Sequence, residues 1–209
     1  MSINIRRTID WVGAGKVTSA KNQGSCGSCW AFSAIGALES RSKIRGGNDL
    51  LSEQQLVDCA TGYFRNKGCG GGYPQMGLLY TYYFGSTSQG SYPYTARQGR
   101  CKKRGGSFRI RKIYMARASY SCRNIPYALK YGPLSVAVAV DSRAWRFVGG
   151  GIIRGCGHKL NHAVLLVGVN SSYWTFKNSW GKHWGQNGFG KLALNNPCGM
   201  CRYNAYLPY

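Results

Sequence analysis

The sequence predicts an α+β protein with a mainly helical half over residues 1–114 and a mainly β half over residues 115–209. Apolar residues recur at helical spacing only in the first half, and short β-rich runs bounded by Gly, Asn and Ser fill the second. No internal repeat or linker separates the halves, so we expect one compact body. A cleft between two such halves is a favoured place for a substrate.

Three helices are expected in the first half. Residues 28–45 carry apolar side chains at helical spacing, and Gly46 and Gly47 provide a stop. Ser52 and Gln55 form a capping box, in which each side chain bonds the backbone N–H of the other residue and starts a second helix. A third helix is predicted over residues 75–84.

The second half contains four short runs of strand-forming residues, at 134–140, 163–169, 173–177 and 189–194. These runs predict an antiparallel sheet or β-barrel. The longest apolar run, residues 163–169, is far shorter than the roughly 20 residues that cross a bilayer. No stretch has the pattern of a signal peptide, so we expect Met1 to begin a mature or trimmed chain, with no membrane span.

The nine cysteines favour an oxidising compartment, either extracellular or lysosomal and endosomal. Cys26 and Cys29 have no second cysteine pair or histidine pair to complete a zinc site, and we expect neither metal nor cofactor. The odd count leaves one cysteine free after up to four bridges. The sequon at Asn170 is compatible with secretion and makes this residue a glycosylation candidate.

The formal net charge of +22 is very unevenly distributed, because no Asp or Glu occurs between Asp58 and Asp141 or after Asp141. Basic residues concentrate in residues 97–123, where Arg100, Lys102, Lys103, Arg104, Arg109, Arg111 and Lys112 are the candidate polyanion-binding residues. Such a run attracts polyanions over about 8 Å at physiological salt. The alternative is a solvated basic face without a partner, and composition does not decide between them.

Cys29 stands at the start of the first predicted helix. A thiol becomes a thiolate near neutral pH beside a cation or at a helix N-terminus, and a histidine from the β half would supply the cation. The alternatives are a buried inert thiol or a bridge to Cys26. A redox CxxC would predict a βαβ pattern around it, and that pattern is absent.

Three segments together resemble the papain and cathepsin family. Residues 23–32, QGSCGSCWAF, are similar to the family's nucleophile segment, residues 160–163 to its histidine segment and residues 177–181 to its asparagine segment. His162 and Asn178 follow Cys29 by 133 and 149 residues, as the family spacing requires. The resemblance covers nearly the whole chain and implies a papain-like two-domain fold, helical half and β-barrel half, with the active-site cleft between them.

The resemblance implies a cysteine endopeptidase. Cys29 would be the attacking thiolate, His162 its acid and base, and Asn178 the residue that orients the histidine ring. Gln23 would contribute its side-chain amide to the oxyanion hole, and Trp180 would cover the His162–Asn178 hydrogen bond. His158 and His183 lack such an orienting residue and are expected at the surface.

The same resemblance implies three disulfides, Cys26–Cys69, Cys59–Cys101 and Cys156–Cys198. A fourth, Cys122–Cys201, is our preferred pairing for the remaining two, because further free thiols in an oxidising compartment are a liability. The implied substrate-binding residues are Gly71, Gly72, Tyr73, Pro74, Ala137, Asn161, Ala163, Trp180 and Tyr203. Gly71 and Gly72 would pair with the substrate backbone. The walls of the main specificity pocket, Tyr73, Pro74, Ala137 and Ala163 with Tyr203 at the floor, are apolar or aromatic and predict an apolar side chain there, in a pocket shortened by Tyr203.

Implied partners are peptide or protein substrates and propeptide or cystatin-type inhibitors, with an acidic polyanion, sulfated polysaccharide or silica, suggested by charge. One rival function is a structural or mineral-associated protein on a cathepsin fold, similar to the sponge silicateins, which carry Ser at the nucleophile position. Cys29 argues against it, while the basic composition and residues 145–147 favour it. A nucleic-acid-binding module would also suit the charge, but no recognition motif occurs.

Overall fold

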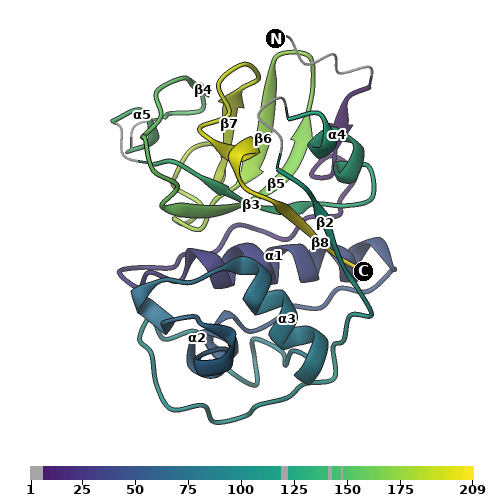
Figure 1. The fold of residues 1–209 in the computed structure, drawn as a ribbon, viewed down its shortest axis with the longest axis vertical. Helices are drawn as coiled ribbons and strands as arrows, with labels where there is room; N and C mark the ends of the chain where they lie inside the picture. The colour runs from purple at the N-terminus through teal and green to yellow at the C-terminus, as the bar shows by residue number, and fades with distance from the viewer. Residues whose placement is uncertain (1–6, 119–121, 141–142, 147) are drawn as a thin grey trace.

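The structure is a computed structural model that describes residues 7–118, 122–140, 143–146 and 148–209. Phe147, in the segment that favoured the mineral-associated function, and residues 119–121 of the basic region lie outside the described residues. Three helices gather on one side of the molecule and the strands on the other (Figure 1). Within the described residues, no helix is long and apolar enough to cross a membrane.

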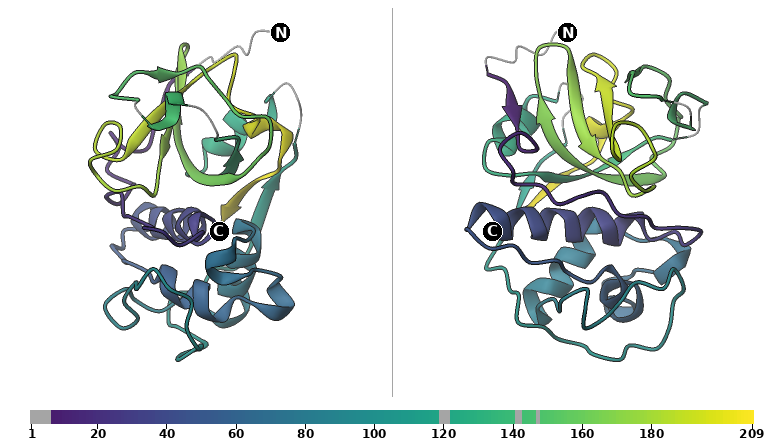
Figure 2. Two further views of the ribbon diagram at one scale, coloured as in Figure 1. Left: turned by 90° about the vertical axis from the view of Figure 1, so that its left-hand side faces the viewer. Right: turned by 180° about the vertical axis from the view of Figure 1, so that it is seen from behind.

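The three predicted helices are confirmed as α1 (Cys29–Ile44), α2 (Glu53–Cys59) and α3 (Pro74–Phe84). Pro74 starts α3, where its missing N–H and fixed φ suit the first helical turn. α1 is buried from Trp30 to Ser42, because it lies between the sheet and the other two helices (Figure 2). Short 3₁₀ turns, η1 (Gly62–Phe64) and η2 (Gly68–Gly70), connect α2 to α3.

Only half of the predicted capping box forms. The Ser52 hydroxyl accepts the N–H of Gln55 at 3.0 Å and caps α2. The prediction of the reciprocal bond, from the Ser52 N–H to the Gln55 side chain, is wrong. The Ser52 N–H donates to the carbonyl of Thr87, and Gln55 Oε1 accepts the N–H of Thr87 at 2.9 Å. The Gln55 amide nitrogen also donates to the carbonyls of Lys103 and Gly105, so this side chain holds two distant loop segments against α2.

The four predicted strand runs are confirmed as β3 (Leu134–Val138), β5 (His162–Val169), β6 (Tyr173–Lys177) and β7 (Phe189–Ala193). Elements that the sequence pattern did not predict are β1 (Ile9–Asp10), β2 (Ile113–Ala116), α4 (Asn124–Leu129), α5 (Arg143–Arg146), β4 (Ile152–Ile153), η3 (Met200–Arg202) and β8 (Ala205–Pro208).

Within the described residues the strands form one eight-stranded sheet in the order β2-β8-β3-β5-β6-β7-β4, with β1 beside β5. The pairings are antiparallel except for β4 with β7. An antiparallel sheet is therefore confirmed in the main, while its closure into a barrel stays a prediction. Ile9 pairs with Val169, so the chain's early residues join the sheet. The division at residue 114 stays a prediction.

Separate apolar clusters fill the two sides of α1. Trp30, Ile35 and Leu38 pack among the helices, while Trp174 and Phe176 belong to the cluster of the β side. The helix is fastened to the sheet by polar contacts as well. Ser33 Oγ donates to the carbonyl of Val164 at 2.7 Å and lies 2.5 Å from the hydroxyl of Ser135. Both bonds are buried, where a lost partner costs about 1–3 kcal/mol.

All four predicted disulfides form: Cys26–Cys69, Cys59–Cys101, Cys122–Cys201 and Cys156–Cys198. The pairing of Cys122 with Cys201 joins the start of α4 to η3. Each bridge closes a loop of more than 40 residues and so restricts the unfolded chain, by about 2–4 kcal/mol per bridge in the loop-entropy account.

Candidate active site

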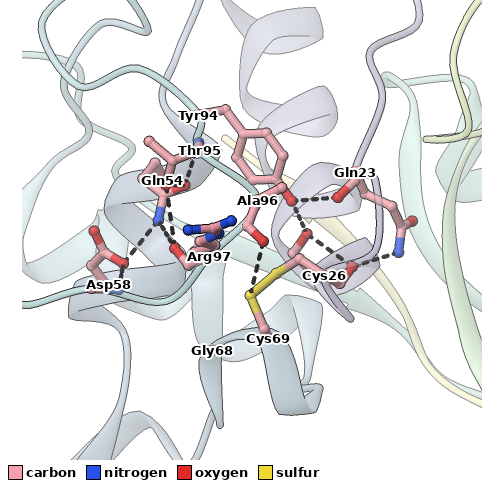
Figure 3. Close-up of a disulfide and its surroundings, with 12 residues drawn as sticks. Gln23, Cys26, Gln54, Asp58, Gly68, Cys69, Tyr94, Thr95, Ala96 and Arg97 are labelled. Atoms are coloured by element: carbon pink, nitrogen blue, oxygen red, sulfur yellow. Dashed lines mark hydrogen bonds between the residues drawn. A yellow bond between two sulfur atoms is a disulfide. The ribbon is translucent and has the colours of Figure 1, made fainter.

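Cys29 is the first residue of α1 and, of the nine cysteines, all of which are described, the one outside a disulfide. The preceding segment is held by the Cys26–Cys69 bridge (Figure 3). Gly27 packs so closely that an added Cβ would lie 2.5 Å from the carbonyl oxygen of Cys69. This packing explains the glycine between the two cysteines of the motif, and it delivers the Cys29 thiol at the N-terminal end of the helix dipole.

His162 and Asn178 come from adjacent antiparallel strands, the first residue of β5 and the residue after β6. His162 Nε2 lies 2.8 Å from Asn178 Oδ1, and both side chains are buried. The same oxygen accepts the N–H of Ser179 at 2.9 Å. Because Oδ1 is an acceptor, Nε2 carries the hydrogen and Nδ1 is left as the basic nitrogen.

Trp180 covers this pair as predicted, with its ring centroid 5.0 Å from that of His162. The fully buried Trp145 approaches the same imidazole edge to face at 6.5 Å. The hydrogen bond between His162 and Asn178 is therefore shielded from water by aromatic rings. His158 and His183 are exposed, as expected, and belong to no such arrangement.

Gln23 is fixed by four hydrogen bonds. Its Nε2 donates to the Cys26 carbonyl at 3.0 Å, and its Oε1 accepts from the Ser179 hydroxyl at 2.6 Å. Its backbone N–H donates to the Ser179 carbonyl, while its carbonyl accepts from the Tyr94 hydroxyl at 2.7 Å (Figure 3). Nε2 keeps a second hydrogen that can bind a ligand oxygen.

Two of these supporting residues were missed in the sequence. Ser179 had a local signal, because it directly follows Asn178 in the motif. Tyr94 had none: it comes from a loop more than 60 residues beyond Gln23 and also receives a bond from the Ser28 hydroxyl at 2.6 Å.

Burial disfavours an isolated charge on either reacting group. It raises the pKa of the Cys29 thiol, an effect opposed by the backbone N–H groups of Ala163, Trp30 and Cys29 itself. Burial also lowers the pKa of His162, which the Asn178 bond opposes. The contact with the Ala163 amide places the sulfur at the start of β5, beside His162. Because burial outweighs these backbone N–H groups, a thiol pKa below the ordinary value requires the additional charge of an imidazolium.

The predicted substrate-binding residues come from several elements. Tyr73 is exposed, Pro74 is buried at the start of α3, and Ala137 pairs with Ala163 across β3 and β5. The Tyr203 hydroxyl accepts a 2.7 Å bond from Gln75.

The structure explains the glycines at the predicted positions 71 and 72 in different ways. Gly71 has a φ of +106° with open space at its Cβ position, whereas a Cβ on Gly72 would lie 2.5 Å from Asn66 Oδ1. The absence of a side chain at Gly72 is therefore explained by internal packing. Asn161 is exposed, and its amide bonds both backbone groups of Val140.

The seven predicted polyanion-binding residues are all exposed. Arg109 donates to the Tyr83 carbonyl at 3.2 Å, and Arg104 lies over the Phe84 ring. Among the described residues, the ion pairs are those of Lys21 with Glu39 and Glu53, so none of the seven is paired with an acid. Asn170 is partly exposed, and its Oδ1 accepts the N–H groups of Ser172 and Tyr173.

A free thiol at a helix start, bonded to the amide of the residue that follows a histidine whose ring a carboxamide orients, is the arrangement of the papain-like cysteine proteases. A model described as papain family cysteine protease matches residues 5–207, and the chain belongs to that family. It is 40% identical over 201 residues to Cathepsin L 2 of Paramecium tetraurelia, covering 92% of this chain and 62% of that protein. Papain of Carica papaya is 38% identical over 205 residues, with 95% and 59% covered.

The fold agrees with that relationship. A crystal structure of the Carica candamarcensis cysteine protease CMS1MS2 in complex with E-64 matches with a TM-score of 0.89 at 33% identity, covering 98% of both chains. A digestive procathepsin L2 proteinase from Tenebrio molitor larval midgut matches with a TM-score of 0.86 and 36% identity, covering 99% of this chain and 69% of that one. The chain spans 62% or less of the length of the curated relatives given above.

Proposed function

We propose that this chain is a cysteine endopeptidase that hydrolyses peptide bonds through a thiolate–imidazolium pair. The observation that carries the proposal is the free Cys29 thiol, held at the N-terminus of α1 against the Ala163 amide, beside a His162 ring that Asn178 orients. A nucleophile, a base and an orienting group for that base are the components that covalent catalysis requires.

In the first half-reaction, the Cys29 proton passes to His162 Nδ1 and the thiolate attacks the substrate carbonyl carbon. The imidazolium then protonates the departing amine as the tetrahedral intermediate collapses to a thioester. In the second half-reaction, neutral His162 takes a proton from water, and the resulting hydroxyl attacks the thioester carbonyl. Collapse releases the carboxylic acid product and returns the proton to the sulfur.

The oxyanion formed in both steps is stabilised by two donors, the free N–H of the Gln23 amide and the backbone N–H of Cys29. Because Gln23 Nε2 already donates one hydrogen to Cys26 and its oxygen is held by Ser179, the second hydrogen has a fixed direction before substrate binds. A donor fixed in advance in this way typically contributes about 3–4 kcal/mol to transition-state stabilisation.

The proposed substrate cleft lies between the helical and β halves. Gly71 is suited to backbone pairing with an extended peptide, because it leaves open space where a side chain would stand. Tyr73 and Pro74 from α3, Ala137 and Ala163 from the sheet, and Tyr203 give the main specificity pocket apolar walls and limited depth. An apolar residue of modest size is therefore the preferred occupant.

The four disulfides suit an oxidising compartment, either extracellular or lysosomal and endosomal. Propeptide and cystatin-type inhibitors are proposed partners by family membership. A mineral-associated role is not favoured, because the relatives given above are named as proteases and Cys29 is retained where silicateins carry Ser.

The test is labelling with an irreversible, thiol-directed peptidyl inhibitor, followed by identification of the modified residue by mass spectrometry. We expect stoichiometric labelling of Cys29 and parallel loss of hydrolysis of a fluorogenic peptide. Cys29→Ala should be inactive and unlabelled while melting at the wild-type temperature. Full activity of that folded variant would sink the assignment.

A further inference from the structure

A groove of about 670 Å³ is lined by residues of β2, α4 and the end of β8. These elements lie toward the C-terminal end of α1, whereas Cys29 stands at its start (Figure 1). Its lining includes Tyr114, Tyr127, Tyr131 and Tyr209, which are 48%, 63%, 52% and 43% exposed. Exposed aromatic side chains gathered in one concave site are unusual on a soluble protein and mark binding surfaces. None of the lining residues is acidic.

Two arginine side chains lie against the ring of Tyr209 at one end of this groove, and the backbone of a third arginine is bonded to the same residue. The Arg41 guanidinium lies 3.8 Å from the Tyr209 ring centroid and that of Arg45 lies 5.6 Å from it, while the backbone N–H of Arg111 donates to the Tyr209 carbonyl at 2.7 Å. Tyr114 packs edge to face on Tyr209 at 5.6 Å and continues the aromatic surface into the groove.

These arginines lack the acidic partners that usually accompany such a cluster. Arg41 is 8% exposed and its buried Nε has no hydrogen-bond partner among the described residues. No carboxylate in the described chain forms an ion pair with Arg41, Arg45 or Arg111. Burial lowers the pKa of Arg45, and the like charges of Arg41 and Arg111 lower it further, against an opposing effect of Tyr209. The C-terminal end of the α1 dipole favours cations, which accounts for Arg41 and Arg45. It does not account for Arg111, which comes from another segment.

We propose that this groove is a binding site for an acidic polysaccharide, with the exposed Arg45 and Arg111 receiving sulfate or carboxylate groups and the tyrosines contacting the sugar rings. Planar guanidinium groups match such oxyanions in paired hydrogen bonds. Further cations flank the aromatic lining: Arg117 lines the groove, and Lys130 Nζ lies 5.7 Å from the Tyr127 ring centroid. This site is separate from the peptidase site and does not depend on it.

Other occupants fit these observations less well. A second copy of the chain would bring together two bodies of net charge +22, which repel one another. Single-stranded nucleic acid binds by stacking its bases on ring faces, whereas in the Tyr114–Tyr209 and Tyr127–Tyr131 pairs, inclined at 80° and 70°, the edge of one ring packs on a face of the other. The disulfides also indicate an oxidising compartment, where acidic polysaccharides are more accessible than nucleic acid.

The experiment measures binding of a size-defined heparin hexasaccharide by calorimetry at about 0.15 M NaCl. Tyr127→Ala/Tyr131→Ala and Arg45→Gln/Arg111→Gln should each lower the affinity about tenfold or more. The matched control for the first is Tyr82→Ala/Tyr83→Ala, which removes two exposed tyrosines from α3. The control for the second is Arg143→Gln/Arg154→Gln, near β4 at the other end of the strand order. Both controls should bind as the wild type does.

Equal losses in a groove variant and its control would overturn the proposal in favour of unspecific charge attraction. Absence of hexasaccharide binding would overturn it outright, as would tighter groove-dependent binding of an oligothymidine of equal charge. Hydrolysis of a small neutral peptide should be unchanged in all four variants, so failure of this proposal leaves the proposed peptidase function untouched. Arg41 is left intact because its burial makes a change there a risk to folding.

Discussion

The Ser179 hydroxyl donates a 2.6 Å hydrogen bond to Gln23 Oε1, although the two residues lie 156 positions apart. The backbone of Ser179 meanwhile donates to Asn178 Oδ1, which holds the His162 ring. One residue therefore positions both the proposed oxyanion donor and the proposed base.

Ser179→Ala should lower kcat about tenfold while leaving KM nearly unchanged, because Gln23 loses the bond that aims its amide at the developing oxyanion. Ser179→Thr keeps a hydroxyl and should retain most of the activity. Steady-state kinetics with one fluorogenic peptide measures both. Equal losses in the two variants would indicate a packing effect in place of a positioning one.

Alkylation at pH 6 tests the proposed ion pair directly. Wild-type Cys29 should react with iodoacetamide faster than free cysteine, because an adjacent imidazolium stabilises the thiolate. In His162→Ala, burial outweighs the opposing backbone N–H groups and raises the pKa of Cys29, so the thiol stays protonated at pH 6 and should react more slowly than free cysteine. Cys29→Ala gives the background. Equal rates in wild type and His162→Ala would exclude the ion pair.

The buried Glu53 should make stability depend on pH. Burial raises its pKa from 4.5 to about 7, although Lys21 pairs with it at 2.7 Å and opposes the shift. Between these two values the folded protein binds more protons than the unfolded chain. The contribution of Glu53 is therefore fully present below pH 4.5 and is lost as the pH rises through about 7, by up to about 1.4 kcal/mol per pH unit.

Urea unfolding of wild type and Glu53→Gln at several pH values between 4.5 and 7.5 measures this effect. The free energy of unfolding of the wild type should fall relative to that of the variant as pH rises. A constant difference between the two proteins would show that Glu53 is ionised throughout the range.

Tyr203 should limit the depth of the specificity pocket. Tyr203→Ala should raise kcat/KM for a Phe-bearing peptide relative to a Val-bearing one, because the larger side chain gains room. Tyr203→Phe is the matched control: it keeps the ring and loses only the hydroxyl that Gln75 bonds. An unchanged Phe-to-Val ratio in Tyr203→Ala would mean that Tyr203 points elsewhere.

The exposed basic loop should add to retention on a heparin column. Reversing Lys102, Lys103 and Arg104 to Glu should shift elution to lower salt, since each neutralised anionic site releases counterions. Hydrolysis of a small neutral peptide serves as the control and should not change. Unchanged elution would leave these residues as a solvated face, whatever the tyrosine-lined groove binds.

The sequence predicted those elements whose signal is local and long enough to read. α1 and α3 repeat their apolar residues over three turns or more, and β5 is a continuous apolar run. β1 and β4 have two residues each, too few for any alternation to appear. They are strands only because a partner strand supplies their hydrogen bonds.

The sequence likewise predicted the reacting groups of the candidate site, but not the residues that hold those groups in place. Cys29, His162 and Asn178 stand in motifs, whereas the bond from Tyr94 to Gln23 follows no spacing rule. Gln55 shows how a local pattern can fail. The capping box predicts that its side chain accepts the Ser52 N–H, but in the structure this side chain accepts the N–H of Thr87, 32 residues away. Arg41 and Arg45 share one face of α1 at a spacing of four residues, but their contact with the ring of Tyr209, more than 160 residues later in the chain, follows no local pattern.

The bond from Ser33 to the Val164 carbonyl has a consequence for variation of the chain. Ser33 lies one helical turn beyond Cys29, and Val164 lies two residues beyond His162, so this bond fixes the helix to the strand directly behind the two reacting groups. Residues 45–112 lie on the other side of α1, and the Ser33–Val164 bond does not involve them. Apart from Cys69 and Tyr94, which hold the segment before Cys29, substitutions there can change what the protein recognises while this bond keeps the spacing of thiol and imidazole constant.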